Sequence, residues 1–94
     1  MLTLIISPAV RDKIAAREIT QRDIEQCFEN RCGEFLVDDR EENKSDPATL
    51  WFISETNHGR LLKVVFIPRD GNYTIRSAYP ANSKQIRIYD ELAK

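Results

Sequence analysis

The side chains of this sequence that could act on a charged substrate are mainly cations in its second half. They are Arg60, Lys63, Arg76 and Arg87. Cations held close together neutralise a phosphate and stabilise the charge that develops on phosphorus, so RNA cleavage without a metal ion needs little more than these and a proton-transfer group. The side chains that could transfer the proton or stack a base are Tyr79, Tyr73 and His58.

Two simpler interpretations of these residues stay open at the level of sequence. Lys63 and Arg76 could form ion pairs with Glu55 and its neighbours on a solvated sheet face. His58 is the one histidine of the chain, and it lies in Asn57-His58-Gly59, where polar turn residues are expected without any catalytic role.

The sequence contains no recognisable set of metal ligands. Cys27 and Cys32 are five residues apart, which does not place them on one face of a helix, and no second cysteine pair completes a zinc site. The acidic run 38–46 lacks the alternation and the glycine of a calcium-binding loop. We therefore expect no metal and no other cofactor, and we expect both cysteines to be reduced thiols.

The composition is that of a folded chain. The 94 residues are 41% hydrophobic and 31% charged, with a formal net charge of −1. This predicts a single domain over residues 1–94 with a modest core. Nucleic-acid binders usually carry a basic excess, so the near-neutral charge is mild evidence against one, although a local patch survives such an average. No apolar run is long enough to span a membrane, so we expect a cytoplasmic protein.

The stretch from Arg60 to Tyr79 has the pattern of a β-hairpin. Two apolar, β-branched runs flank Asp70-Gly71, a pair typical of type I′ turns because both central residues need positive φ. If Arg69 pairs with Asn72, strict alternation divides the hairpin into two faces. The less apolar face would carry Lys63, Val65, Ile67, Thr74, Arg76 and Ala78, and the core face would carry Leu62, Val64, Phe66, Tyr73, Ile75, Ser77 and Tyr79.

Capping signals predict three helices, over about 8–17, 21–32 and 83–92. Ser7-Pro8 supplies the N-cap and the first helical residue of the first helix. Thr20 caps the second helix, and Gly33 is its expected end. Asn82 or Ser83 caps the third.

The remaining apolar segments are strand candidates, at residues 2–6, 35–38, 50–56 and in the two arms of the hairpin. The polar run 38–47 is expected to be an exposed loop. The order is β-α-α, then an antiparallel meander, then α. It predicts an α+β fold in two layers, with an antiparallel sheet of about four to five strands and the helices on one face.

The order and spacing of these segments resemble the BrnT family, toxins of type II toxin–antitoxin pairs with a RelE-like ribonuclease fold. The resemblance runs from about Ile19 to Glu91. It is carried by "DDR", a polar loop, an apolar strand, "GRLLKVVF", a short turn, an isoleucine-containing strand, "SAYPAN", and a helix with "RIYDE".

The resemblance places the functional residues of that family one at a time. Arg60 matches the arginine that follows the turn glycine. Ser77-Ala78-Tyr79 matches the family's "SAR", so Tyr79 stands where the family has a second functional arginine. Ala16-Arg17 falls near the family's Lys-His pair, so the histidine is absent and Arg17 is the one cation that remains.

The resemblance implies a metal-independent endoribonuclease. Its expected catalytic residues are Arg60, Arg76 and Tyr79, and its expected binding residues are Lys63, Arg17, His58 and Arg87. The two catalytic arginines would hold phosphate, and the tyrosine would act as an acid, a base or a stacking surface. RNA, an antitoxin-like protein and a second copy of the chain are the expected partners. The alternative is a non-catalytic binding or regulatory module on the same scaffold that engages a protein partner, because function resides in the site and not in the fold.

Overall fold

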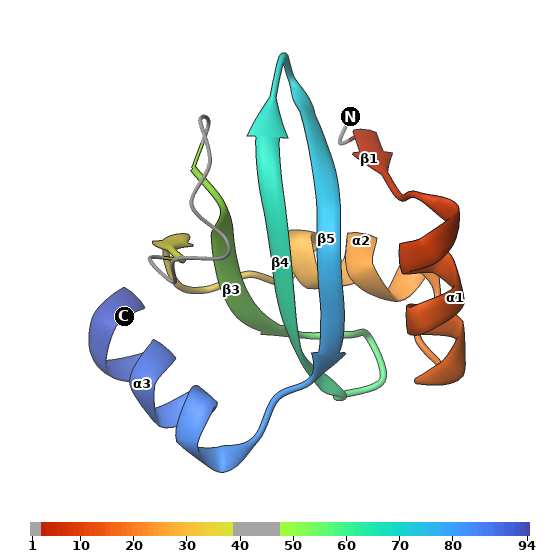
Figure 1. Cartoon of the computed structure of the whole chain (residues 1–94). Coiled ribbons are helices and arrows are strands. Elements are labelled where there is room, and N and C mark those ends of the chain that lie inside the picture. The colour runs from red at the N-terminus through yellow and green to blue at the C-terminus, as the bar shows by residue number, and fades with distance from the viewer. Residues whose placement is uncertain (1–2, 39–47) are drawn as a thin grey trace.

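Three helices and five strands make up the part of the chain that the structure describes, residues 3–38 and 48–94 of a computed structural model (Figure 1). In chain order they are β1 (Thr3–Ile5), α1 (Pro8–Ala16), α2 (Gln21–Glu29), β2 (Leu36–Val37), β3 (Leu50–Glu55), β4 (Leu61–Arg69), β5 (Asn72–Pro80) and α3 (Ser83–Ala93). The α+β class and the expected order of elements are confirmed. The expected polar loop lies, from residue 39 to residue 47, outside the described residues. Among those described, no helix has the length and apolar character needed to cross a membrane.

The five strands form one mixed sheet in the order β1-β5-β4-β3-β2. Strands β2 to β5 are the expected antiparallel meander. β1, however, pairs in parallel with β5, so the prediction of a purely antiparallel sheet was wrong. The reason is topological. Hairpins can only make antiparallel pairs, but β1 reaches β5 through both helices and the whole meander, which leaves its direction free.

The β4–β5 hairpin has the predicted turn and an irregularity that the sequence did not reveal. Asp70 and Gly71 have φ of 52° and 80°, and Arg69 pairs with Asn72, so both turn predictions are confirmed. The register then shifts between Val65 and Phe66, which leaves Arg76 without a partner on β4. An extra residue of this kind is a β-bulge, and it reverses the alternation of every residue beyond it.

The bulge therefore corrects the predicted faces of the hairpin. Ala78 pairs with Val64, and both are fully buried. Tyr79 pairs with Lys63 and Ser77 pairs with Val65, so they face the other side of the sheet and not the core side assigned to them.

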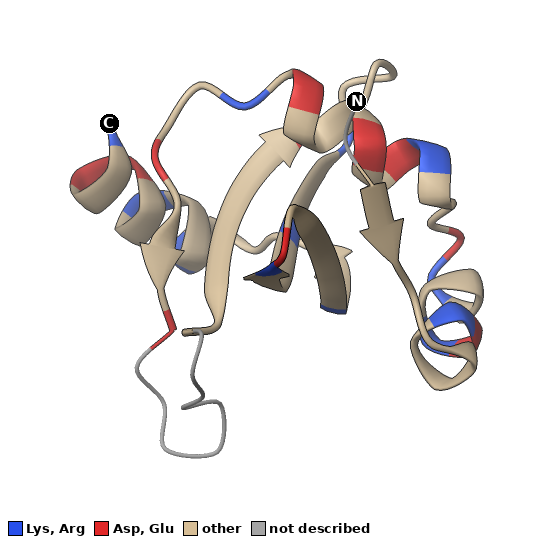
Figure 2. Ribbon diagram, turned by 90° about the horizontal axis from the view of Figure 1, so that it is seen from above, with Lys and Arg blue, Asp and Glu red and all other residues tan. Residues whose placement is uncertain are grey.

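Helices cover both faces of the sheet, so the expected arrangement of two layers was wrong. Trp51 and Phe52 are consecutive in β3 and point to opposite faces. The ring of Phe28 in α2 lies 4.7 Å from that of Phe52, and the ring of Tyr89 in α3 lies 5.6 Å from that of Trp51. Figure 2 shows α3, beside the C-terminus, on the other side of β3 from α2.

An aromatic cluster joins α2 to the core of the sheet. Phe28 is its hub, with ring centroids 4.7 to 6.1 Å from those of four partners. The partners are Phe35, Phe52, Phe66 and Tyr73. Phe52 and Phe66 are fully buried, so these contacts fix α2 on the meander.

The three predicted N-caps are confirmed, but the predicted end of α2 is not. Ser7 accepts a hydrogen bond from the first turn of α1, and Thr20 and Asn82 each form a capping box with the third helical residue. α2 ends at Glu29, four residues before Gly33. Asn30 ends it by turning its side chain to the β3–β4 turn, as described below.

Gly33 is required for packing and not for ending the helix. It is buried against Tyr89, and a Cβ at this position would lie 2.6 Å from Oη and 2.9 Å from Cζ of that side chain. Tyr89 is 1% exposed and donates a hydrogen bond from Oη to the Glu34 carbonyl at 2.9 Å. The glycine thus allows α3 to approach the 30–35 segment.

Gly33→Ala should lower the free energy of unfolding by about 1 to 3 kcal/mol, the usual range for overpacking a well-filled site. Urea denaturation would measure this. The control is the same change in a Tyr89→Phe background, where the closest atom is gone and Gly33→Ala should cost less. If the two substitutions lower the free energy of unfolding by strictly additive amounts, the absence of a Cβ at Gly33 is not needed to accommodate Tyr89.

Candidate functional site

Two cations and two aromatic rings gather on the sheet face opposite α2. Lys63 places its Nζ 4.5 Å from the ring centroid of Trp51 and 5.8 Å from that of Tyr79. The guanidinium of Arg17 lies 5.6 Å from the Tyr79 centroid. Such contacts are cation–π interactions. We call these four residues, Arg17, Trp51, Lys63 and Tyr79, the cation–aromatic cluster.

The register of the sheet explains how three members of the cluster meet. Trp51 pairs with Val65, and Lys63 pairs with both Ile53 and Tyr79, so their side chains share one face. Each of the three is half-buried. Without the bulge at Arg76, Tyr79 would point into the core, so the cluster depends on that irregularity.

The fourth member, Arg17, enters from the end of α1. Its Nη1 donates a hydrogen bond to the Ala78 carbonyl of β5 at 3.0 Å, a contact between residues 61 apart in sequence. This bond holds the guanidinium beside β5, where it covers the Tyr79 ring. The arginine is half-buried.

The two cations of the cluster lie near aromatic rings and form no ion pair with a carboxylate of residues 3–38 or 48–94. Neither Arg17 nor Lys63 forms an ion pair with any acidic side chain in the described part of the chain, so the alternative that Lys63 pairs with Glu55 is not what the structure shows. Acidic positions line α2 on the other side of the sheet (Figure 2). There Arg22 lies 3.2 Å from Glu25 and from Glu29. The chain thus has a local cationic site although its formal net charge is only −1.

Arg60, the first residue expected to hold phosphate, lies against the end of α1. Its Nη1 and Nη2 donate hydrogen bonds of 2.8 Å to the carbonyls of Glu18 and Arg17. Arg17 is the C-cap of α1, so its carbonyl has no partner within the helix and lies at the negative end of the helix dipole, and Glu18 is the residue that follows the cap. Arg60 therefore touches the backbone of one cluster residue and not the rings.

The end of α1 has an unusual backbone conformation. Glu18 N–H binds the Ala15 carbonyl and Ile19 N–H binds the Ile14 carbonyl, both at 2.9 Å, which is the Schellman pattern. Glycine is the usual residue at the position of Glu18, because φ there is positive, and Glu18 has φ of 58°. The predicted end of this helix at about residue 17 is confirmed.

The other predicted site residues lie elsewhere. Arg76 is exposed at the bulge, and His58 is exposed in the β3–β4 turn, where its backbone N–H binds Thr56 Oγ1 at 3.3 Å. Arg87 lies on α3, where it lines a separate shallow pocket of about 430 Å³ with Ser83 and Glu91. None of the three contacts a ring of the cluster in the described structure.

Sequence reasoning missed Trp51 as a site residue. Its signal was present, since Trp51 and Ile53 alternate with the core residue Phe52 and so face away from α2. Tyr79, one of the predicted site residues, was placed on the wrong face of the sheet.

A second hollow lies between α3 and the end of β3. This cleft has a volume of about 570 Å³, and Ile53, Leu61 and Tyr89 contribute apolar lining. Exposed Cys32 and Asp90 are among its polar residues. It holds no member of the cation–aromatic cluster.

Neither a metal site nor a known relative adds to this description. Among the described residues no group of three or more His, Cys, Asp or Glu side chains could hold a metal ion. Comparison of the chain with protein-family models, curated proteins and solved structures found no match.

Glu18→Gly should raise the free energy of unfolding by about 0.5 to 1 kcal/mol, because glycine adopts positive φ without the steric cost that other residues meet. Thermal unfolding would measure the gain. Glu18→Ala is the control, since it removes the carboxylate but keeps the cost, and it should give no gain. Equal stabilisation by both variants would assign the effect to charge.

The two cysteines should differ sharply in reactivity. Both are free, Cys27 is fully buried, and burial raises the pKa of its thiol to about 12, with a further rise from the Asp23 carboxylate. Because the thiolate is the reactive form, only Cys32 should react with a thiol reagent at pH 8 in the folded protein. Mass spectrometry should find one adduct natively, none in Cys32→Ser, and two in urea. Rapid double labelling of the folded protein would contradict this.

Proposed function

We propose that this protein is a BrnT-like protein with a RelE-like ribonuclease scaffold, which binds single-stranded RNA at the cation–aromatic cluster and cleaves it without a metal ion. The observation that carries the proposal is that Arg17 and Lys63, which pair with no carboxylate of the described residues, flank the half-exposed ring of Tyr79. Cations supply phosphate binding, and aromatic rings supply stacking surfaces for bases.

The roles follow from the chemistry of the side chains. Lys63 can turn from the rings to a phosphate oxygen, since its flexible stem carries a point charge. Arg17 keeps one nitrogen on Ala78 and has further N–H donors for the same phosphate. The Tyr79 ring lies on the same face as the Lys63 ammonium. As the 2′-oxygen attacks phosphorus and gives its own proton to water, the P–O5′ bond breaks and the Tyr79 hydroxyl can give a proton to the departing 5′-oxygen, which leaves a 2′,3′-cyclic phosphate.

A second candidate function is the non-catalytic binding module. The observation that favours it is that both terminal nitrogens of Arg60 are bound to the carbonyls of Arg17 and Glu18, just after α1. Two N–H donors of the residue expected to stabilise charge on phosphorus are thus already bound to the protein backbone. In this case the same cluster would engage a protein partner.

The decisive experiment incubates the protein with fluorescent mixed-sequence RNA in chelator at low salt. Tyr79→Phe should keep RNA binding and lower the cleavage rate by about 100-fold or more, the usual contribution of a general acid. Lys63→Gln should weaken binding and reduce the slope of log affinity against log salt by about 0.7, the value for one phosphate contact on a single strand. Anisotropy and gel electrophoresis measure the two effects.

The matched control is Lys13→Gln, which removes the same charge from the exposed side of α1 and should change neither quantity. Binding without cleavage would favour the non-catalytic module. Absence of RNA binding by the folded protein would contradict the assignment of the cluster to RNA.

A further inference from the structure

Arg60 connects two parts of the molecule that are far apart in sequence. Its guanidinium reaches the end of α1, 42 and 43 residues away, with bonds to Glu18 and Arg17. In Figure 1 the turn between β3 and β4 points toward the C-terminal end of α1. Both bonds join a cation to helix-end carbonyls, which makes them stronger than neutral hydrogen bonds.

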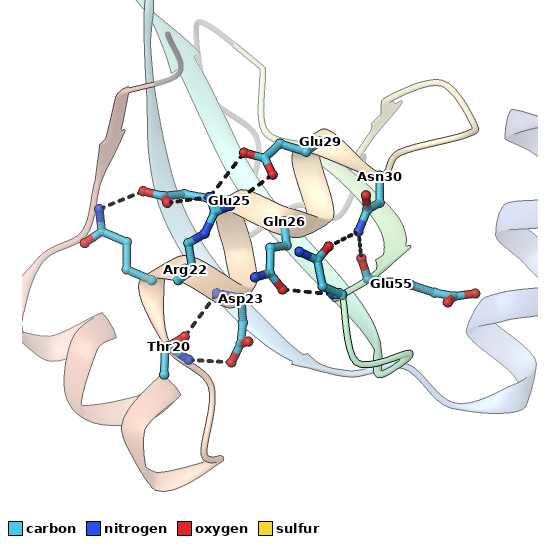
Figure 3. A network of polar contacts seen from close by, with 10 residues as sticks. Thr20, Arg22, Asp23, Glu25, Gln26, Glu29, Asn30 and Glu55 are labelled. Atoms are coloured by element: carbon cyan, nitrogen blue, oxygen red, sulfur yellow. Dashed lines mark hydrogen bonds and ion pairs between the residues drawn. The ribbon is translucent and has the colours of Figure 1, made fainter.

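The turn that carries Arg60 is itself held by α2. Thr56 Oγ1 accepts the backbone N–H of Arg60 at 3.3 Å. The side chain of Gln26 is 8% exposed and accepts the backbone N–H of Asn57 at 2.8 Å. Asn30 Nδ2 donates two hydrogen bonds to the same turn, one to Asn57 Oδ1 at 3.0 Å and one to the Glu55 carbonyl at 2.9 Å (Figure 3). The start of the Arg60 side chain is thus fixed on a packed helix.

The contacts of Arg60 lead from the β3–β4 turn to the cation–aromatic cluster. Arg60 binds the backbone of Arg17, and the side chain of Arg17 binds the Ala78 carbonyl and covers the Tyr79 ring. Glu18, the next residue, is held with positive φ. A helix end in this conformation needs partners for its carbonyls, and Arg60 is the side chain that supplies two of them.

We propose that Arg60 is a positioning residue, which fixes the end of α1 and thereby holds the Arg17 guanidinium over the ring of Tyr79 without touching the RNA. The RNA part of this inference rests on the proposed function, but the positioning does not. Arg60 already uses N–H donors on both of its terminal nitrogens for these carbonyls, so the backbone after α1 sets the orientation of its guanidinium. The same arginine therefore acts on the site through the backbone of a second arginine.

The positioning is tested by NMR without any RNA. Protons of the Arg17 side chain should show a ring-current shift from Tyr79, and Tyr79→Leu defines its absence. Arg60→Ala should abolish that shift while the amide signals of the sheet core stay in place. Arg87→Ala, which removes an exposed arginine of α3, should preserve the shift. Should Arg60→Ala fail to fold, Arg60→Gln provides the same test.

A folded Arg60 variant that keeps the wild-type Arg17 shift would overturn the proposal, and so would a shift that Tyr79→Leu leaves unchanged.

RNA binding then distinguishes a positioning role of Arg60 from direct contact with phosphate. If it acts through Arg17, the double variant Arg60→Ala/Arg17→Ala should bind RNA no more weakly than Arg17→Ala alone. If it contacts phosphate, the losses should multiply and the salt slope should fall by about a further 0.7. A protein that binds no RNA fails the proposed function, while the NMR result still decides the positioning.

Discussion

The extra residue in β5 is the constraint on which the arrangement of the sheet faces depends. Because Arg76 has no partner on β4, the alternation of side chains reverses after Ile75. Ala78 then packs in the core and Tyr79 turns to the face of Lys63 and Trp51. A regular hairpin would have buried a phenol beside the aromatic core and left a methyl group outside. β-bulges often reorient a side chain beside a functional site, and this one builds the cation–aromatic cluster.

A second constraint links the cluster to the rest of the fold. α2 is fixed on the meander by the rings around Phe28, and it holds the β3–β4 turn through Gln26 and Asn30. That turn carries Arg60 to the end of α1, and α1 carries Arg17 to Tyr79. The candidate site is therefore connected to the core by hydrogen bonds from side chains to the backbone, which is how a small domain can hold flexible cations in place.

Whether the surface can attract a phosphate depends more on how charge is distributed over the two faces of the sheet than on the net charge of the chain. The acidic residues of α2 lie on one side of the sheet, partly paired with Arg22, and the cluster lies on the other. The layers between them are apolar, so the two sets of charge are separated by the core. A net charge of −1 is thus compatible with a local site for a phosphate. The same cations lie over aromatic rings, and neither has a carboxylate partner within the part of the chain that the structure describes.

The sequence by itself determined the elements, because their signals are local. The caps at Ser7, Thr20 and Asn82, the Asp70-Gly71 turn and the alternating apolar runs each depend on residues a few positions apart. Only the tertiary structure decided the direction of β1, the placement of α3 on the second face, the partner of Gly33 and the bulge at Arg76. These depend on contacts between segments far apart in the chain, and no local pattern records them. For the site this means that Lys63, Arg17 and Tyr79 could be named from residue type and resemblance. Their meeting, the presence of Trp51 and the capping role of Arg60 required the packed sheet and helices, because a bulge and a guanidinium spanning 43 residues are products of the whole fold.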